Sequence, residues 1–450
     1  MESKKGKFSH WLKYSITARM LVVGFLLVIL LIPLQFVKEL ISERAFRQQE
    51  VVRDINSKWG KEVVLSGPVL KIPYKTYKEE KVYIQKTKSY EIKTEEILNE
   101  AYLFPDALYI DSTVKIKEEP LQRGIYESAV YTAQIGVKGN FPPIDFTEQD
   151  ILPGDIIWDK ITLLIRSSNL KGVKDNLEVQ VGDQVLAMAP RYSQEYLNAL
   201  QSSSVSGISS ENNGGLPFSF NLNINGSESL QFIPVGKETR VTMESDWDSP
   251  SHMGKYIPED GSREISKDGF SASWKVLQIN RQFEQQFFNR LPDLLEFAFG
   301  TKLIVPVDEY QKSERTAKYG FMVIGLTLLV FLLIQLVSKI YIHPFQYVMI
   351  GLALVMFYTL LISISEHSSF LKAYLIAGGS VLGLITLYSR GILKGFKFPL
   401  LVAASLGSLY AFIYVIIQLE NYALLAGSIG LFVILAIIMF ASRKIDWGNG

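Results

Sequence analysis

The chain contains no cysteine among its 450 residues and only four histidines. The missing cysteine excludes disulfide bonds, thiolate zinc sites, iron–sulfur clusters and cysteine nucleophiles. The histidines are scattered, and no two of them have the spacing of zinc ligands on one helix. Phosphate-binding loops, G-x-S-x-G nucleophile motifs and convincing dinucleotide fingerprints are also missing. We therefore predict no catalytic residue, metal or cofactor, and we expect the chain not to be an enzyme.

Neither sign of charge is in excess, because 46 Lys and Arg balance 45 Asp and Glu. A nucleic-acid-binding protein would show a basic domain, so nucleic acid is not an expected partner. The charge is unevenly distributed: it is dense between Lys38 and Lys318 and nearly absent from most of the rest. This division predicts a membrane-embedded part and a water-exposed part.

Long apolar runs without internal charge mark the membrane-embedded part. The first covers residues 20–37, and with residues 16–19 it reaches the length of about 20 residues that spans a bilayer. Because KELISERAF follows it, and not a small-residue cleavage site, we interpret it as an uncleaved anchor. Five more runs cover residues 319–337, 344–364, 373–389, 398–419 and 421–441. They predict a bundle of five transmembrane helices.

The positive residues near the ends of these runs predict how the chain is oriented. The count covers only the short segments between the apolar runs and at the two ends of the chain. With the N-terminus in the cytoplasm, nearly all Lys and Arg of these short segments lie on the cytoplasmic side, and the outer loops SEHSSF and LEN carry none. The expected divisions are a cytoplasmic N-terminus and anchor (1–37), an outer domain (38–318), the helix bundle (319–441) and a cytoplasmic tail (442–450). Both termini are then cytoplasmic.

The outer domain shows the alternating patterns of β-strands. Stretches such as VVLSGPVLKIPY and ALYIDSTVKIK, broken by Gly, Pro, Asn and Asp, predict antiparallel strands in sandwich-like sheets. We also expect helices over residues 38–58 and 280–299, and a hairpin turn at Asn225–Gly226. The Lys- and Tyr-rich stretch 71–93 is interpreted as a charged hairpin that covers a sheet edge. The fold class is thus an α+β membrane protein.

Ionisable residues are missing from the interior of the apolar runs, which argues against an ion-coupled transporter. Gly379 and Gly383 form a small-residue face that is expected to pack within the bundle. The polar candidates gather at the outer surface of the membrane, and they are Asp308, Tyr310, Arg315, Lys318, Glu366 and His367. We predict that Glu366 pairs with Arg315 or Lys318. The alternative that this ring leaves open is a membrane enzyme or flippase acting on lipid-linked material.

Several motifs along the whole chain resemble one family. They are residues 343–358 (HPFQYVMIGLALVMFY) with 365–367 (SEH), 306–308 (PVD), 66–74 (SGPVLKIPY), 123–126 (RGIY), 245–247 (SDW), 269–274 (GFSASW) and 443–447 (RKIDW). The sequence is similar in these motifs to the CreD family of bacterial inner-membrane proteins. It departs at residues 169–173 (NLKGV), where an Asp would be expected at position 169.

The resemblance implies a bacterial inner-membrane protein linked to envelope integrity and stress responses, with the outer domain in the periplasm. It implies no enzymatic reaction. The expected partners are the lipid bilayer and an unidentified envelope protein or envelope component that the β-rich domain binds.

Overall fold

The computed structural model describes residues 15–84, 89–117, 121–123, 126–128, 130–191, 195–211, 213–303, 309–393, 395–419 and 422–443. Packing divides the chain into two compact units. The membrane unit is Met1–Glu50 with Val307–Gly450, and the β unit is Val51–Pro306. These boundaries follow contacts, whereas the divisions expected from the sequence follow the surfaces of a membrane, so the two describe different properties.

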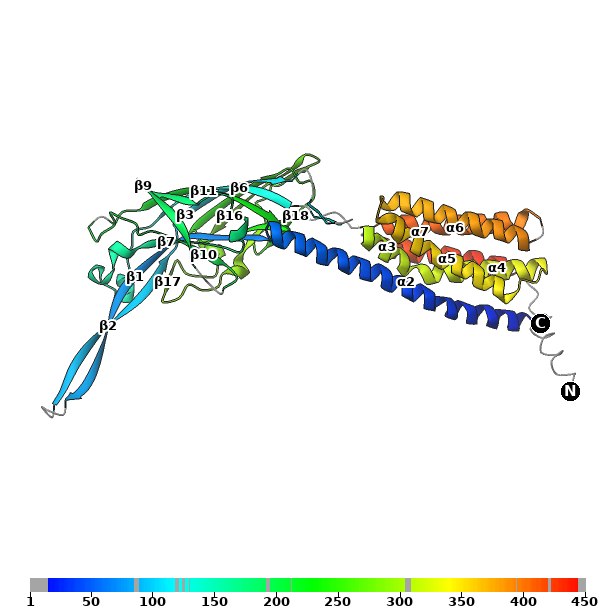
Figure 1. Cartoon of the computed structure of the whole chain (residues 1–450), viewed down its shortest axis with the longest axis horizontal. Helices are drawn as coiled ribbons and strands as arrows, with labels where there is room; N and C mark the ends of the chain where they lie inside the picture. Colours follow the sequence, from blue (N-terminus) through cyan, green and yellow to red (C-terminus); the bar gives the residue numbers. More distant parts are fainter. Residues whose placement is uncertain are drawn as a thin grey trace. The chain divides into compact units, whose positions relative to one another are not determined.

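The membrane unit is built from helices, and six of the described ones coincide with the apolar runs (Figure 1). They are α2 (Ile16–Trp59), α3 (Glu309–Lys318), α4 (Gly320–Ser338), α5 (Pro344–Ser365), α6 (Phe370–Ile392), α7 (Lys397–Gln418) and α8 (Ala423–Ser442). Among the described residues, six helices are long and apolar enough to cross a membrane, namely α2 and α4 to α8. This confirms the predicted anchor and five-helix bundle.

Glycines let α2 approach the bundle closely. A Cβ atom added to Gly351 of α5 would lie 2.1 Å from Cδ1 of Leu30, and one added to Gly320 of α4 would lie 2.7 Å from Cδ1 of Leu34. Both leucines are buried. Lipid provides little hydrophobic driving force between helices, so close van der Waals contact at small residues holds them together.

Aromatic side chains fill the interior of the bundle. Phe357 of α5 stacks on Tyr410 of α7 with ring centroids 4.6 Å apart, and Tyr374 of α6 lies edge-on to Phe357. The Tyr374 hydroxyl donates a hydrogen bond to the backbone oxygen of Tyr410 over 2.8 Å.

The prediction for the small-residue face was wrong, because a Cβ at Gly379 or Gly383 would meet no atom within 4 Å. Those glycines lie away from the helix contacts.

The β unit contains eighteen described strands, sixteen of them joined in one continuous ladder. The bounds are β1 (Val63–Ile84), β2 (Ser89–Leu103), β3 (Ala107–Ile116), β4 (Leu121–Arg123), β5 (Tyr126–Ser128), β6 (Val130–Phe141), β7 (Thr162–Ser167), β8 (Glu178–Val181), β9 (Gln184–Arg191), β10 (Asn198–Ser202), β11 (Leu216–Ser227), β12 (Ser229–Ile233), β13 (Glu238–Ser245), β14 (Pro250–Gly254), β15 (Glu264–Ser266), β16 (Gly269–Leu277), β17 (Gln286–Phe288) and β18 (Phe299–Leu303). Short 3-10 turns lie at Thr147–Gln149, Pro153–Asp155, Trp158–Lys160, Leu170–Gly172, Gln278–Asn280 and Leu295–Phe297.

The ladder has two halves that share β9. The first part of β9 pairs with β8, which continues through β11, β6, β3, β13, β16 and β15. The second part pairs with β10, which continues through β7, β1, β12, β18 and β14. Pairing is antiparallel except for β1 with β12 and β13 with β3. The predicted β-rich class is confirmed, with these two parallel pairs added.

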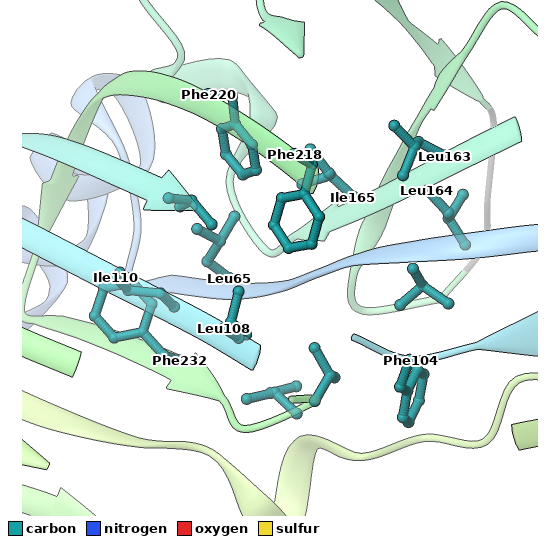
Figure 2. Close-up of a cluster of buried hydrophobic side chains, with 14 of the residues drawn as sticks. Leu65, Phe104, Leu108, Ile110, Leu163, Leu164, Ile165, Phe218, Phe220 and Phe232 are labelled. Atoms are coloured by element: carbon teal, nitrogen blue, oxygen red, sulfur yellow. The ribbon is translucent and has the colours of Figure 1, made fainter. Parts of the chain in front are cut away.

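One hydrophobic core joins both halves of the ladder (Figure 2). Leu65 and Phe232 contribute to it from β1 and β12, whereas Ile110 and Phe218 come from β3 and β11. Buried positions alternate along β3, as a strand with one face on a core requires. Burial of each large apolar side chain contributes about 1.5–3 kcal/mol, so this core can hold the unit without metal or disulfide.

The outer parts of β1 and β2 form a two-stranded arm beyond the rest of the ladder (Figure 1). Opposite residues share a face, so the tilted rings of Tyr83 and Tyr90, with centroids 5.2 Å apart, lie on the same side as exposed Tyr77. The other face carries Lys78 opposite Glu95. The predicted hairpin over residues 71–93 is confirmed, but it extends from a central strand and does not cover a sheet edge.

The helix predicted over residues 38–58 is confirmed as the continuation of α2. Its last turns belong to the β unit, where the Asn56 amide donates to Glu228 over 2.9 Å and accepts from the Ser128 hydroxyl over 2.6 Å. Asn56 is buried away from water, so these hydrogen bonds supply the partners that its amide group needs.

Two local predictions were wrong. Residues 280–299 form no α-helix: β17 and a 3-10 turn occupy this stretch, because the rings of Phe283 and Phe287 pack on Phe104 and not on one helix face. Asn225 and Gly226 lie inside β11, paired with β6, and form no turn. Gly226 is needed there because a Cβ would lie 2.4 Å from the Tyr131 ring.

Candidate functional site

Glu366 is the centre of the first polar cluster, which lies in the membrane unit. It follows α5 directly, and its side chain is only 15% exposed. The Tyr310 hydroxyl of α3 donates to Glu366 Oε1 over 3.2 Å. Arg44 Nε of α2 lies 3.8 Å from the same oxygen. A mostly buried carboxylate thus joins the end of α5 to two other helices.

The other sequence candidates lie outside this cluster. The predicted partners of Glu366 were wrong, because Lys318 is exposed and bonds Glu314 over 3.3 Å, one helical turn before it. Among the described residues no ion pair joins Arg315 to Glu366. His367 is exposed at the end of α5. Asp308 lies outside the described residues.

Arg44 was missed in the sequence, although a signal for it exists. Leu30, Leu34, Val37 and Ile41 are buried at helical spacing along α2, and Arg44 continues the same face one turn later. The helix beyond residue 37 was predicted, but the buried face of the anchor was not followed into it.

The second candidate is a cavity of about 210 Å³ in the β unit. Its lining comes from strands that the ladder brings together: Lys71 of β1, Glu100 and Tyr102 of β2, Arg166 of β7 and Arg191 of β9. The lining is completed by Leu164, Glu195, Leu197, Ala199, Asn289, Arg290 and Leu291. Charged side chains thus dominate the polar part of the wall.

One carboxylate of the cavity is fully engaged. Lys71 Nζ lies 2.6 Å from Glu100 Oε1, and the Tyr102 hydroxyl donates to Glu100 Oε2 over 2.7 Å. Burial acts to raise the pKa of Glu100, but these two hydrogen bonds outweigh it and hold the pKa below its ordinary value. Burial also raises the pKa of Tyr102 well above 10, with the Glu100 charge adding to the effect. Glu100 is therefore ionised and Tyr102 neutral near pH 7.

Arg166 has a different environment. It is 5% exposed, and burial lowers the pKa of its guanidinium, with Glu195 and Asp293 acting in the opposite direction. Nη1 lies 3.8 Å from Glu195 Oε2. Two strands away in the same sheet, Arg191 Nη1 donates to Gln201 over 2.8 Å. The site can therefore present positive charge to a small group entering the cavity. The described residues hold no group of three or more His, Asp or Glu side chains suited to a metal ion.

Comparison with known proteins assigns the chain to a family. The family model described as inner membrane protein CreD matches residues 15–448. The chain belongs to the CreD family. The inner membrane protein CreD of Escherichia coli strain K12 is 28% identical over 427 residues, which cover 93% of this chain and 91% of that protein. The resemblance seen in the motifs is confirmed over nearly the whole length.

Membership of the CreD family agrees with the six helices that can cross a membrane. The cavity was not foreseen, because its residues come from strands distant in the sequence. A signal was present in β7, where TLLIRS is buried at every position and still contains Arg166. A charged residue within a fully buried strand is expensive unless something compensates its charge, and such a residue is a candidate for function.

Proposed function

We propose that this CreD-family chain is a bacterial inner-membrane protein that supports envelope integrity, and that its β unit binds an envelope component on the periplasmic side. The family description and the six membrane-spanning helices support the inner-membrane location. The positive residues of the short loops support cytoplasmic termini and a periplasmic β unit. In this proposal the chain acts by binding and carries out no reaction.

The observation that carries binding is the charged cavity of the β unit. Clefts with a few convergent polar groups and perturbed pKa values are the usual places where ligands bind. The cavity has Arg166 buried in its wall and the exposed Arg191 and Arg290 around it. An envelope molecule could therefore reach a cationic wall without any movement of the core.

Site-directed photo-crosslinking in intact cells tests this function. Benzoylphenylalanine replaces Glu195, an exposed residue of the cavity lining that leaves the cations in place, and a control protein carries it at Ile257, which is 82% exposed and not among the cavity residues. We expect ultraviolet-dependent adducts at position 195 that are weak or missing at position 257. Equal adduct patterns at both positions would show that the cavity holds no envelope component.

A membrane enzyme or flippase acting on lipid-linked material is the second candidate. The observation that favours it is the shielded Glu366 carboxylate with Tyr310 and Arg44 in the membrane unit. Under this candidate Glu366→Gln would remove function in cells while the protein remained folded. Under the binding proposal the same variant keeps function.

A further inference from the structure

Arg166 carries more hydrogen-bond donors than the described protein satisfies. A guanidinium has five N–H donors in a planar fork. Nε and Nη2 of Arg166 are buried and have no hydrogen-bond partner among the described residues. Nη1 is 3.8 Å from the Glu195 carboxylate, which is an ion-pair distance and too long for a hydrogen bond. The buried charge is therefore compensated only in part.

Arg281 shows how the same unit treats a buried arginine that has a structural role. Arg281 is 4% exposed, close to the 5% of Arg166. Its Nη1 donates to the backbone oxygens of Pro234 and Val235, and its Nη2 donates to Gln285. Its Nε is buried without a partner among the described residues, so both terminal nitrogens of Arg281 are bonded and only Nε is not. Burial alone thus does not leave an arginine without partners in this fold. The contrast indicates that Arg166 is kept available for a group from outside the chain.

The charge of the wall indicates the sign and size of that group. Among the described residues, the lining contains Lys71, Arg166, Arg191 and Arg290 against Glu100 and Glu195, which leaves a surplus of two positive charges. Asp293, which is not among the lining residues, also favours the charged form of Arg166. A phosphate monoester carries about 1.5–2 negative charges at pH 7 and offers three acceptor oxygens. The guanidinium fork matches phosphate oxygens geometrically.

We propose that this cavity is a binding site for a phosphate group, with Arg166 as the buried donor and Arg191 and Arg290 as the outer cations. The volume of about 210 Å³ corresponds to about seven waters at roughly 30 Å³ each, so it admits a phosphate with part of the molecule that carries it. This inference rests on the proposed function for its setting, because it names the chemistry of the envelope component.

Ligand binding to the full-length protein in detergent tests the site. Inorganic phosphate and glycerol 3-phosphate are titrated separately while the thermal unfolding temperature is measured. A ligand that binds only the folded state raises this temperature with concentration. We expect both ligands to raise it, with tighter binding of glycerol 3-phosphate if the natural phosphate is carried on a larger molecule. Tighter binding of inorganic phosphate would assign the site to the free ion.

Three variants identify the residues responsible. Arg166→Gln should weaken phosphate binding by about tenfold or more, because a charge-assisted, bidentate contact is lost. Arg191→Gln changes an exposed side chain and should weaken binding by a smaller factor, which keeps the test informative if Arg166→Gln does not fold. Arg240→Gln is the matched control, since Arg240 is an exposed arginine of β13 outside the cavity, bonded to Glu238. It should bind phosphate as the unchanged protein does.

Two results would overturn the phosphate site. One is no shift in unfolding temperature with either ligand up to about 10 mM, which is weaker than millimolar affinity. The other is a shift that persists equally in Arg166→Gln and Arg191→Gln, because the ligand would then bind elsewhere or the cavity would hold water alone. The outcomes differ from those of the crosslinking test. If the protein binds phosphate but forms no specific crosslinked adducts in cells, the phosphate site stands and the proposed binding of an envelope component is overturned.

Discussion

The two units of this chain stabilise their interiors in different ways. The membrane unit packs glycines against leucines and stacks aromatic rings, as Gly351 with Leu30 and Phe357 with Tyr410 show. The β unit also buries charged groups, among them Arg166 and Arg281, whereas the buried polar residues described in the membrane unit, such as Gln335, are uncharged. The difference follows from the solvent. Lipid cannot drive apolar surfaces together, so the helices depend on close van der Waals packing between complementary surfaces. Water drives the β core together and leaves enough stability to hold a buried cation.

The largest expected difference is in the cost of removing a buried ring from each unit. Phe232→Ala in the β unit loses both the transfer free energy and the contacts around the cavity it leaves, about 3–5 kcal/mol. Phe357→Ala in the membrane unit should cost less, because its side chain moves between protein and lipid and only the cavity cost remains. Unfolding of the full-length protein in mixed micelles, followed separately by β and helical circular dichroism, measures both. Equal costs would contradict the comparison.

A smaller effect is expected from a single methyl group between helices. Gly351→Ala places a Cβ 2.1 Å from Leu30 Cδ1 and should destabilise the membrane unit by about 1–3 kcal/mol. Gly379→Ala is the matched control, since no atom lies within 4 Å of its added Cβ. Helical unfolding temperatures of the two variants decide the matter. If both variants matched the unchanged protein, close contact at Gly351 would not hold α2 to the bundle.

The smallest effect concerns the pH dependence of the β unit. His252 Nδ1 lies 3.1 Å from Thr301 Oγ1, its Nε2 is buried without a partner among the described residues, and its ring packs edge-on to Trp274. Burial, with Arg263 nearby, lowers the pKa of His252 below its ordinary value of about 6.5. The unfolded chain therefore binds the proton more readily. Stability from neutral His252 is present above pH 6.5 and is lost as the pH falls below it.

His252→Gln should flatten this decline, because glutamine keeps a neutral polar group beside Thr301 and does not titrate. Thermal unfolding between pH 5 and 8 in steps of half a unit, for the two proteins in parallel, tests the assignment. A decline of the same steepness in both would assign the pH dependence to other groups.

The helices were predictable from the sequence because a membrane span has a strong signal of length and missing charge. All the expected runs became helices. The β-rich class was predictable from alternation, as in β3. The helical spacing in residues 280–299 misled because its aromatic residues pack individually into the β core. Asn225–Gly226 misled because the close approach of Tyr131, and not a turn, requires the glycine.

Residues that meet across the fold were the hardest to predict. The pairing of Glu366 with Arg44 joins positions more than 300 apart, and no local pattern connects them. Likewise, no local pattern connects Arg166 with the residues of the cavity wall that come from the other strands. Asn169 stands where the resemblance led us to expect an aspartate: its amide donates to the Asn225 backbone oxygen over 2.9 Å and its oxygen accepts from Gly172 over 3.1 Å. An aspartate could accept in this way but could not donate.

The claim that the β unit lies outside the cytoplasm is tested most directly by thiol labelling in cells. The chain has no cysteine, so single cysteines at Ser210 of the β unit and at Gly391 of α6, both exposed, have no background. With the outer membrane permeabilised, an impermeant thiol reagent should label the cysteine at position 210 and should label that at position 391 only after lysis. Labelling at position 391 with protection at position 210 would contradict the account.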